Sequence, residues 1–351
     1  MSNNFVSNNP FSNMELSSFC GQMALILKSG ISVTEGLDIM LEDASSDEEK
    51  AVLHALLDDI NENGSLSHAL ESTRLFPSYM IHMTAIGEET GTLDDVMDAL
   101  QSHYEREADI AHTIKSAVTY PMIMIGMMVL VIVVLLVKVM PVFHQVFVQL
   151  GTEMTGVSRG LMNMGTLINH YAVFLSIVLL AIVVFGFYTV RTASGRAFSR
   201  KLGYGIRPIR KIYEEIAACR FASGMALTLS SGLNPDRSIE LVRTLIDDPF
   251  FLQKLDVCTE KLTSGEELAP ALFSSGIFTG MYARMTSIGS KTGAMDQVMN
   301  QIASLYQDEI DTRMNNALAI LEPTLVVALS LIVGVILLSV MLPLMGIMSG
   351  I

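Results

Sequence analysis

The sequence predicts an all-α membrane protein with two homologous cytoplasmic helical-bundle domains plus three transmembrane helices. Three observations predict this class. The 351 residues combine a formal net charge of −14 with 50% hydrophobic and only 17% charged residues, so acidic soluble segments and apolar membrane segments share one chain. Three long stretches carry no charged residue, and the chain matches itself at an offset of 202 residues.

The three uncharged stretches are each long enough to cross a bilayer, which takes about 20 apolar residues in a helix. They are Ser116–Val137, Gly160–Val190 and Pro323–Ile351. Because single soluble domains rarely contain three such runs, we expect transmembrane helices rather than buried soluble ones. The predicted helices cover 118–142, 170–190 and 318–346, with an external connection over 143–169 and a tail over 347–351.

The orientation follows from seven basic residues that come after the second span, with no acidic residue between the first and the last of them. They are Arg191, Arg196, Arg200, Lys201, Arg207, Arg210 and Lys211. The external connection offers only Arg159 against Glu153. By the positive-inside rule, the N-terminal region and the region after residue 190 are cytoplasmic. The seven basic side chains are candidates for binding anionic lipid headgroups.

The internal repeat is the most specific feature of the sequence. FCGQMALILKSGISVTEGLDIM, from Phe19, aligns with FASGMALTLSSGLNPDRSIELV, from Phe221, and MTAIGEETGTLDDVM, from Met83, aligns with MTSIGSKTGAMDQVM, from Met285. In the second of these alignments, nine of fifteen positions are identical. The repeat unit is a cytoplasmic domain followed by a span, and the second span connects the two units. The predicted domains cover 15–117 and 191–317, after a disordered N-terminus over 1–14.

Within each unit the apolar spacing is helical rather than alternating. Gly30 and Gly232 are typical of helix ends, because glycine readily adopts the left-handed conformation. The next helix is expected to begin at Thr34 in the first copy and at Asn234–Pro235 in the second. Each domain is therefore predicted to be a bundle of several short helices.

Motifs for catalysis and cofactor binding are missing from the sequence. There is no nucleotide-binding loop, no HExxH and no nucleophile elbow. The three cysteines lack metal-ligand spacing, and all seven histidines precede residue 171 without matching histidines in the other copy. We therefore expect no enzyme activity, no catalytic residue and no cofactor, with histidines at the surface or in packing roles. The acidic chain also lacks the clustered basic charge of a nucleic-acid binder.

Acidic charge is concentrated in the first domain. Residues 1–120 carry 20 acidic and 5 basic residues, a net of −15, whereas residues 191–322 carry 15 of each. Three interpretations remain open: a solvated acidic surface, docking of a basic partner, or a weak calcium site, since calcium takes oxygen ligands. The calcium candidates are Glu88, Glu89, Asp94 and Asp95.

The chain resembles the GspF/PilC family of inner-membrane platform proteins from type II secretion and type IV pilus machines. The resemblance rests on the order domain, span, span, domain, span. Its most specific segments are IGEETGTLDDVM at Ile86, IGSKTGAMDQVM at Ile288 and YQDEIDTRMNNALAILEPTLVVALSLIVGVILLSVMLPL from Tyr306. It covers essentially residues 14–346, and Ser290 and Lys291 depart from the GEETG pattern.

The resemblance implies a non-enzymatic platform in the bacterial inner membrane. Its implied partners are a hexameric secretion ATPase, pilin-like membrane subunits and other inner-membrane assembly proteins. It also implies a homo-oligomer, with a dimer favoured. Whether the product is a pilus, a secretion pseudopilus or a DNA-uptake filament stays open. A subunit of an oligomeric transporter or channel is the main rival, and a membrane enzyme is the other.

Candidate residues for partner contact lie in the glycine pattern and its copy. They are Gly87, Glu88, Glu89, Gly91 and Asp94, with Gly289, Gly293 and Asp296 in the second copy. The competing interpretation is structural: in each copy the pattern is a glycine turn that joins two helices.

Overall fold

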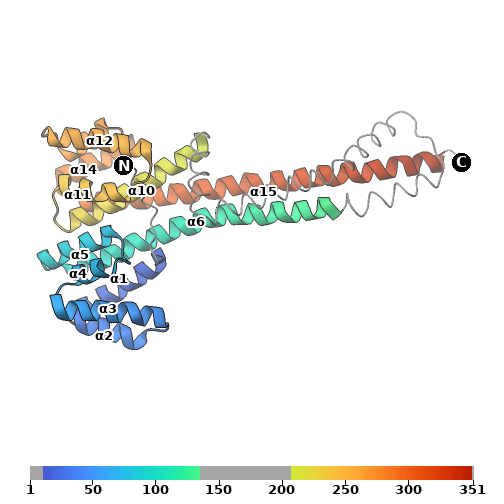
Figure 1. Cartoon of the computed structure of the whole chain (residues 1–351). Coiled ribbons are helices and arrows are strands. Elements are labelled where there is room, and N and C mark those ends of the chain that lie inside the picture. Colours follow the sequence, from blue (N-terminus) through green and yellow to red (C-terminus); the bar gives the residue numbers. More distant parts are fainter. Residues whose placement is uncertain (1–10, 135–206, 350–351) are drawn as a thin grey trace, which may run out of the picture. The chain divides into compact units, whose positions relative to one another are not determined.

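A computed structural model of the protein describes residues 11–134 and 207–349 (Figure 1). Every regular element in these two ranges is helical, which confirms the all-α prediction. The predicted second transmembrane helix over 170–190 and the connection over 143–169 lie outside the described residues.

The two copies fold into the same series of helices, blue to green for the first and yellow to red for the second (Figure 1). The first copy contains α1 (Asn13–Lys28), α2 (Val33–Asp43), α3 (Asp47–Asn63), α4 (Leu66–Thr73), α5 (Ser78–Thr90) and α6 (Leu93–Val134). The second contains α10 (Arg207–Ser230), α11 (Pro235–Val242), the 3₁₀ helix η2 (Arg243–Leu245), α12 (Pro249–Thr263), α13 (Leu268–Ser274), α14 (Met281–Thr292) and α15 (Met295–Ser349). The helices that begin at residues 33, 47, 66 and 93 have counterparts that begin at 235, 249, 268 and 295, each 202 residues later.

The first helix of each copy ends where the sequence predicts. Gly30 and Gly232 adopt φ angles of 80° and 82°, a conformation that residues with a Cβ atom rarely adopt. The predicted start at Asn234 is also right, since its side chain accepts a hydrogen bond from the backbone N–H of Arg237 at 3.0 Å. In the first copy the expected start at Thr34 is wrong, because the Ser32 hydroxyl caps α2 two residues earlier.

Contacts divide the described chain into two compact units. The first unit holds residues 11–113 and 207–312, and therefore the helical parts of both repeats. The second holds residues 114–134 and 313–349. Since α6 and α15 each contribute to both units, one continuous helix per repeat links the two units along the chain.

Each repeat has an apolar core, and the core of the first repeat includes residues of the second. In the second repeat Phe221 and Phe278 are fully buried, with ring centroids 5.9 Å apart. Leu227 and Leu241, also from the second repeat, belong to the buried cluster of the first. The two repeats therefore share an apolar interface, which removes surface from water at both.

Helix α10 is central to this interface. Every residue from Glu215 to Thr228 is buried except Arg220, which is half-buried. The Arg220 guanidinium donates to both carboxylate oxygens of Glu107 on α6, each at 2.8 Å. On the same pair of helices, Arg106 donates to the Ser223 hydroxyl at 3.0 Å. A bidentate ion pair and a charged hydrogen bond thus hold α10 against α6.

The protonation of Glu107 is coupled to this contact. Burial opposes ionisation of the carboxyl, but the adjacent Arg220 outweighs burial and lowers the pKa of Glu107 below its ordinary value. At neutral pH the interface therefore contains a carboxylate and a guanidinium that neutralise each other.

The second unit has the surface expected of membrane helices. Two helical segments, Leu93–Ile132 and Met295–Val335, are long and apolar enough to cross a membrane by length and composition. Large apolar side chains in the second unit face outward, for example Ile123 and Leu331, which are 62% and 65% exposed. Pro121 lies inside α6, so the helix continues past the proline into the apolar segment. These segments overlap the predicted first and third spans.

We expect Glu107→Gln to lower the free energy of unfolding at pH 7 by about 2–3 kcal/mol, because Arg220 loses its closest anionic partner in a half-buried site. Since the folded-state pKa of Glu107 is lowered, the contribution of the ion pair is complete above the ordinary glutamate pKa and is lost as the pH falls through the folded-state value. Urea unfolding in detergent, followed by circular dichroism, measures both effects.

The matched control is Glu240→Gln, which breaks an exposed ion pair with Arg237 on α11. We expect a change below about 1 kcal/mol for it. Equal stability of Glu107→Gln and the unchanged protein at pH 7 would contradict the proposed role of the ion pair.

Candidate functional site

The glycine pattern forms the turn between α5 and α6. Gly91 adopts a left-handed φ of 71°, and the backbone N–H of Thr92 donates to the carbonyl of Gly87 at 2.9 Å. The second copy repeats this turn, with Gly293 at φ 74° and the N–H of Ala294 donating to Gly289 at 3.1 Å. Both turns are therefore glycine-terminated helix ends that immediately start the next helix.

Gly87 and Gly289 have a second reason to be glycine. A Cβ atom on Gly87 would lie 3.0 Å from the Cα of Leu93 and 3.1 Å from the side chain of Val96. A Cβ atom on Gly289 would lie 3.0 Å from the side chain of Val298. The absence of a side chain lets the two helices approach closely, so the structural interpretation accounts for these glycines.

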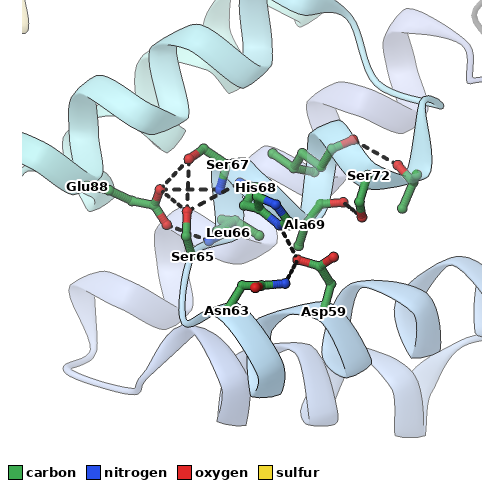
Figure 2. Close-up of polar contacts among 11 residues, drawn as sticks. Asp59, Asn63, Ser65, Leu66, Ser67, His68, Ala69, Ser72 and Glu88 are labelled. Atoms are coloured by element: carbon green, nitrogen blue, oxygen red, sulfur yellow. Dashed lines mark hydrogen bonds and ion pairs between the residues drawn. The ribbon is translucent and has the colours of Figure 1, made fainter.

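Glu88 is held by the first turn of α4, as Figure 2 shows. Its carboxylate accepts hydrogen bonds from the backbone N–H groups of Leu66 and Ser67, at 2.5 and 3.3 Å. It also accepts from the hydroxyls of Ser65 and Ser67, at 2.9 and 2.6 Å. A carboxylate at this position satisfies free N–H groups at the start of a helix and is favoured by the helix dipole. Glu88 thus fastens α5 to α4.

On the other side of the same turn, Asp59 and His68 form a side-chain pair (Figure 2). His68 Nδ1 lies 2.7 Å from Asp59 Oδ1, and Asn63 donates to the same oxygen at 3.3 Å. The hydrogen bond to Asp59 raises the pKa of His68. The start of α4 is therefore tied both to α5 and to α3.

The predicted contact residues of the first copy surround one open hollow of about 760 Å³. Its lining includes Gly87, Glu88, Glu89, Gly91 and Asp94, together with Leu27, Val33, Gly64, Ser65 and Leu93. The lining therefore mixes apolar side chains with carboxylates. This combination suits a partner that places an apolar side chain next to a basic one.

The acidic side chains at this hollow differ in freedom. In the lining, Glu89 is exposed, whereas Glu88 and Asp94 are half-buried. Asp95, which follows the lining residue Asp94 in the chain, is exposed. Lys28 pairs with Asp98 at 3.0 Å, and this hydrogen bond raises the pKa of the lysine. Across residues 11–134 and 207–349 there is no group of three or more histidine, cysteine or acidic side chains placed to hold a metal ion, so the calcium hypothesis gains no support.

In the second copy, the predicted contact residues Gly289, Gly293 and Asp296 occupy the turn between α14 and α15. Ser290 and Lys291, which replace the two glutamates, are exposed. The two turns therefore share a backbone and differ in charge.

The basic stretch lies mostly outside the described residues. Arg191, Arg196, Arg200 and Lys201 fall in the undescribed part, while Arg207, Arg210 and Lys211 begin α10. Arg210 pairs with Glu214 at 3.0 Å and lies 3.9 Å above the ring of Phe250. Arg210 is thus engaged within the protein, whereas Lys211 is exposed.

The contact between the repeats is what the sequence did not reveal. His103 is 3% exposed, lies 3.3 Å from the Ser223 hydroxyl and contacts the ring of Tyr79. Burial lowers the pKa of His103 to about 4, so the ring is neutral at physiological pH. Its packing role agrees with the expectation for the histidines. The sequence gives only an indirect signal, because Glu107 lies three residues after Tyr104 and three before Ile110, on an apolar stripe of the predicted helix.

The fold defines a helical membrane protein that is built from two copies of one unit. A family model described as "Type II secretion system (T2SS), protein F" matches residues 19–141 and again 221–343, more than half of the chain. The two matches are offset by 202 residues, as the repeat predicts. The chain belongs to this family.

Curated relatives agree along nearly the whole chain. The chain is 28% identical over 334 residues to "Type IV pilus assembly protein PilC" of Myxococcus xanthus, covering 95% of this chain and 80% of that protein. It is 28% identical to the protein of the same name from Thermus thermophilus, covering 95% and 83%. It is 23% identical to "Type II secretion system protein F" of Aeromonas hydrophila, covering 95% and 86%. The predicted GspF/PilC family is therefore confirmed.

We expect Glu88→Ala to lower the free energy of unfolding by about 1–2 kcal/mol, because the first N–H groups of α4 lose their acceptor. Glu89→Ala should change it by less than about 0.5 kcal/mol, since Glu89 is exposed. Urea unfolding of both variants measures the difference. Similar losses for the two would show that the capping role of Glu88 is wrong.

Proposed function

We propose that this protein is the inner-membrane platform of a type IV pilus or type II secretion-like machine. Both repeats and the N-terminus face the cytoplasm, and three helices cross the membrane, as the basic residues after the second span indicate. The observation that supports the proposal is the double family match, which covers each repeat together with the candidate membrane segment that follows it.

The platform couples a cytoplasmic ATPase to the assembly of pilin-like membrane subunits and performs no chemistry itself. Helix α6 supports this role, because its first residue, Leu93, lines the hollow and the helix continues to Val134 in the apolar segment. A displacement imposed at the hollow is therefore carried by one unbroken helix into the membrane. The equivalent helix α15 offers the same path from the second repeat.

The hollow between α5 and α6 is the proposed ATPase contact. Its carboxylates, of which Glu89 is exposed, suit a basic partner surface, and its apolar lining residues, such as Leu27 and Leu93, suit an apolar anchor. The other proposed partners are further inner-membrane assembly proteins, anionic lipids at the basic stretch, and a second copy of the chain.

Deleting the gene tests the function directly. We expect the cells to keep the ATPase and the pilin-like subunits in normal amounts but to lose surface filaments or secretion, because assembly lacks its platform. Immunoblots and electron microscopy measure the two quantities, with the restored gene as the control. Normal filaments and secretion in the deletion strain would refute the platform role.

Glu89→Lys tests the hollow as the ATPase contact. We expect affinity for the ATPase to fall about 5- to 10-fold in a pull-down titration, because one favourable charge becomes repulsive at an exposed site. The matched control is Glu71→Lys, the same change at an exposed position on α4 away from the hollow lining. If both variants bind the ATPase equally well, the hollow is not its docking site.

A further inference from the structure

The two repeats contact each other through different faces. The first repeat contributes α5 and α6, and the second contributes α10, α11 and α15, whose Gln307 accepts a hydrogen bond from Arg106 on α6. The Tyr79 hydroxyl on α5 donates to the carbonyl of Gly224 on α10 at 3.3 Å. Leu227 and Leu241, on α10 and α11, pack into the first repeat's core. Besides the contact of α6 with its own counterpart α15, the interface therefore joins two different faces, α5–α6 of the first repeat and α10–α11 of the second.

Because the repeats share one fold, each carries both kinds of face, and one of each remains uncovered. On the first repeat, Leu25 on α1 and Ile39 on α2 are the counterparts of Leu227 and Leu241, 202 residues earlier. Leu25 is 70% exposed where Leu227 is 4% exposed, and Ile39 is 39% exposed where Leu241 is 7% exposed. We call this surface, with Ser18 and Gln22, the open α1–α2 face.

The second repeat leaves the complementary surface uncovered. Met281 on α14 is the counterpart of Tyr79 and is 52% exposed, whereas Tyr79 is 3% exposed. Ile288, seven residues further along α14 on the same side of the helix, is 59% exposed. Arg284, three residues after Met281, and Lys291, three residues after Ile288, lie on the same side and are exposed. This surface is the open α14 face.

The two open faces carry opposite charge. Exposed acidic side chains flank Ile39 on α2, namely Glu35, Asp38 and Glu42. Exposed basic side chains, Arg284 and Lys291, flank Ile288 on α14. Each face is thus an apolar centre with a charged rim, and the rims attract each other.

We propose that the open α1–α2 face of one chain binds the open α14 face of a second copy. The contact within the chain is its template, since the same fold already joins these two kinds of face. Two chains related by a two-fold axis form two such contacts and cover all four faces, which closes the assembly at a dimer. This proposal names the surfaces of the oligomer in the proposed function, and its test does not involve the ATPase.

Cysteine cross-linking in membranes tests the contact. The Tyr79–Gly224 contact has Met281 and Gln22 as its counterparts, so one tagged chain carries Gln22→Cys and a differently tagged chain carries Met281→Cys. A short bismaleimide should join the two tags. Background is low, because the three native cysteines are buried, and burial raises the pKa of Cys219 to about 12 and of Cys258 to about 11.

The control replaces Met281→Cys by Val257→Cys, at an exposed position on α12 outside both open faces. A cross-link to Gln22→Cys should then be absent. A chain that carries both cysteines should give dimers as its largest product. Equal cross-linking with the control, cross-linking only to other proteins, or a ladder of longer oligomers would overturn the proposal.

A gain of affinity provides a second readout. The Glu107–Arg220 pair has Glu309 and Ser18 as its counterparts, so Ser18→Arg should create an ion pair between copies and tighten the dimer about tenfold. Leu25→Asp should weaken it at least as much, whereas Val257→Asp should not. Light scattering of the purified full chain across a dilution series measures all three. No change with Ser18→Arg and Leu25→Asp would also overturn the proposal.

Discussion

The ion pair between Glu107 and Arg220 is the contact on which the arrangement of the two repeats depends. Helix α10 is buried almost all round, and one of its faces is covered only because the first repeat lies against it. Removing that contact would expose Leu227, Ser223 and His103, which are now buried, to water. The pair also has no copy elsewhere in the chain, since its counterparts are Ser18 and Glu309. The fold is therefore duplicated, but the ion pair between Glu107 and Arg220, which joins the two copies, occurs once.

The turns that follow α5 and α14 show which residues a repeat must keep and which it can change. The glycines are required by backbone conformation and by close helix packing, and both copies have them. The residues between the glycines differ between the copies, because they contact different neighbours. Glu88 caps the helix that begins after Ser65, whereas the second copy has Ser290 and Glu267 at these positions, with the two residue types exchanged. The helix after Glu267 has no side-chain cap.

Local chemistry made the helices and the repeat predictable from the sequence. Gly30 and Gly232 end helices because few other residues adopt their backbone conformation. Ser32 was missed as the cap of α2 because Thr34, two residues on, offers the same hydroxyl. The sequence does not predict the role of Glu88, because two of its four donors are backbone N–H groups, which no sequence pattern displays, and the two serine hydroxyls lie more than 20 residues away in the chain. Arg220 and Glu107 are 113 residues apart, and only the fold brings them together.

The charge difference between the copies acquires a structural reason from this arrangement. Both repeats carry the same two kinds of face, so chains that met at random could pair a first repeat with another first repeat. Residues 1–120 have a net charge of −15, so such a pairing brings like charges together and is repelled. Residues 191–322 are neutral overall and place Arg284 and Lys291 on α14. Divergence in charge between two copies of one fold therefore selects first-to-second contacts, the kind already made within the chain.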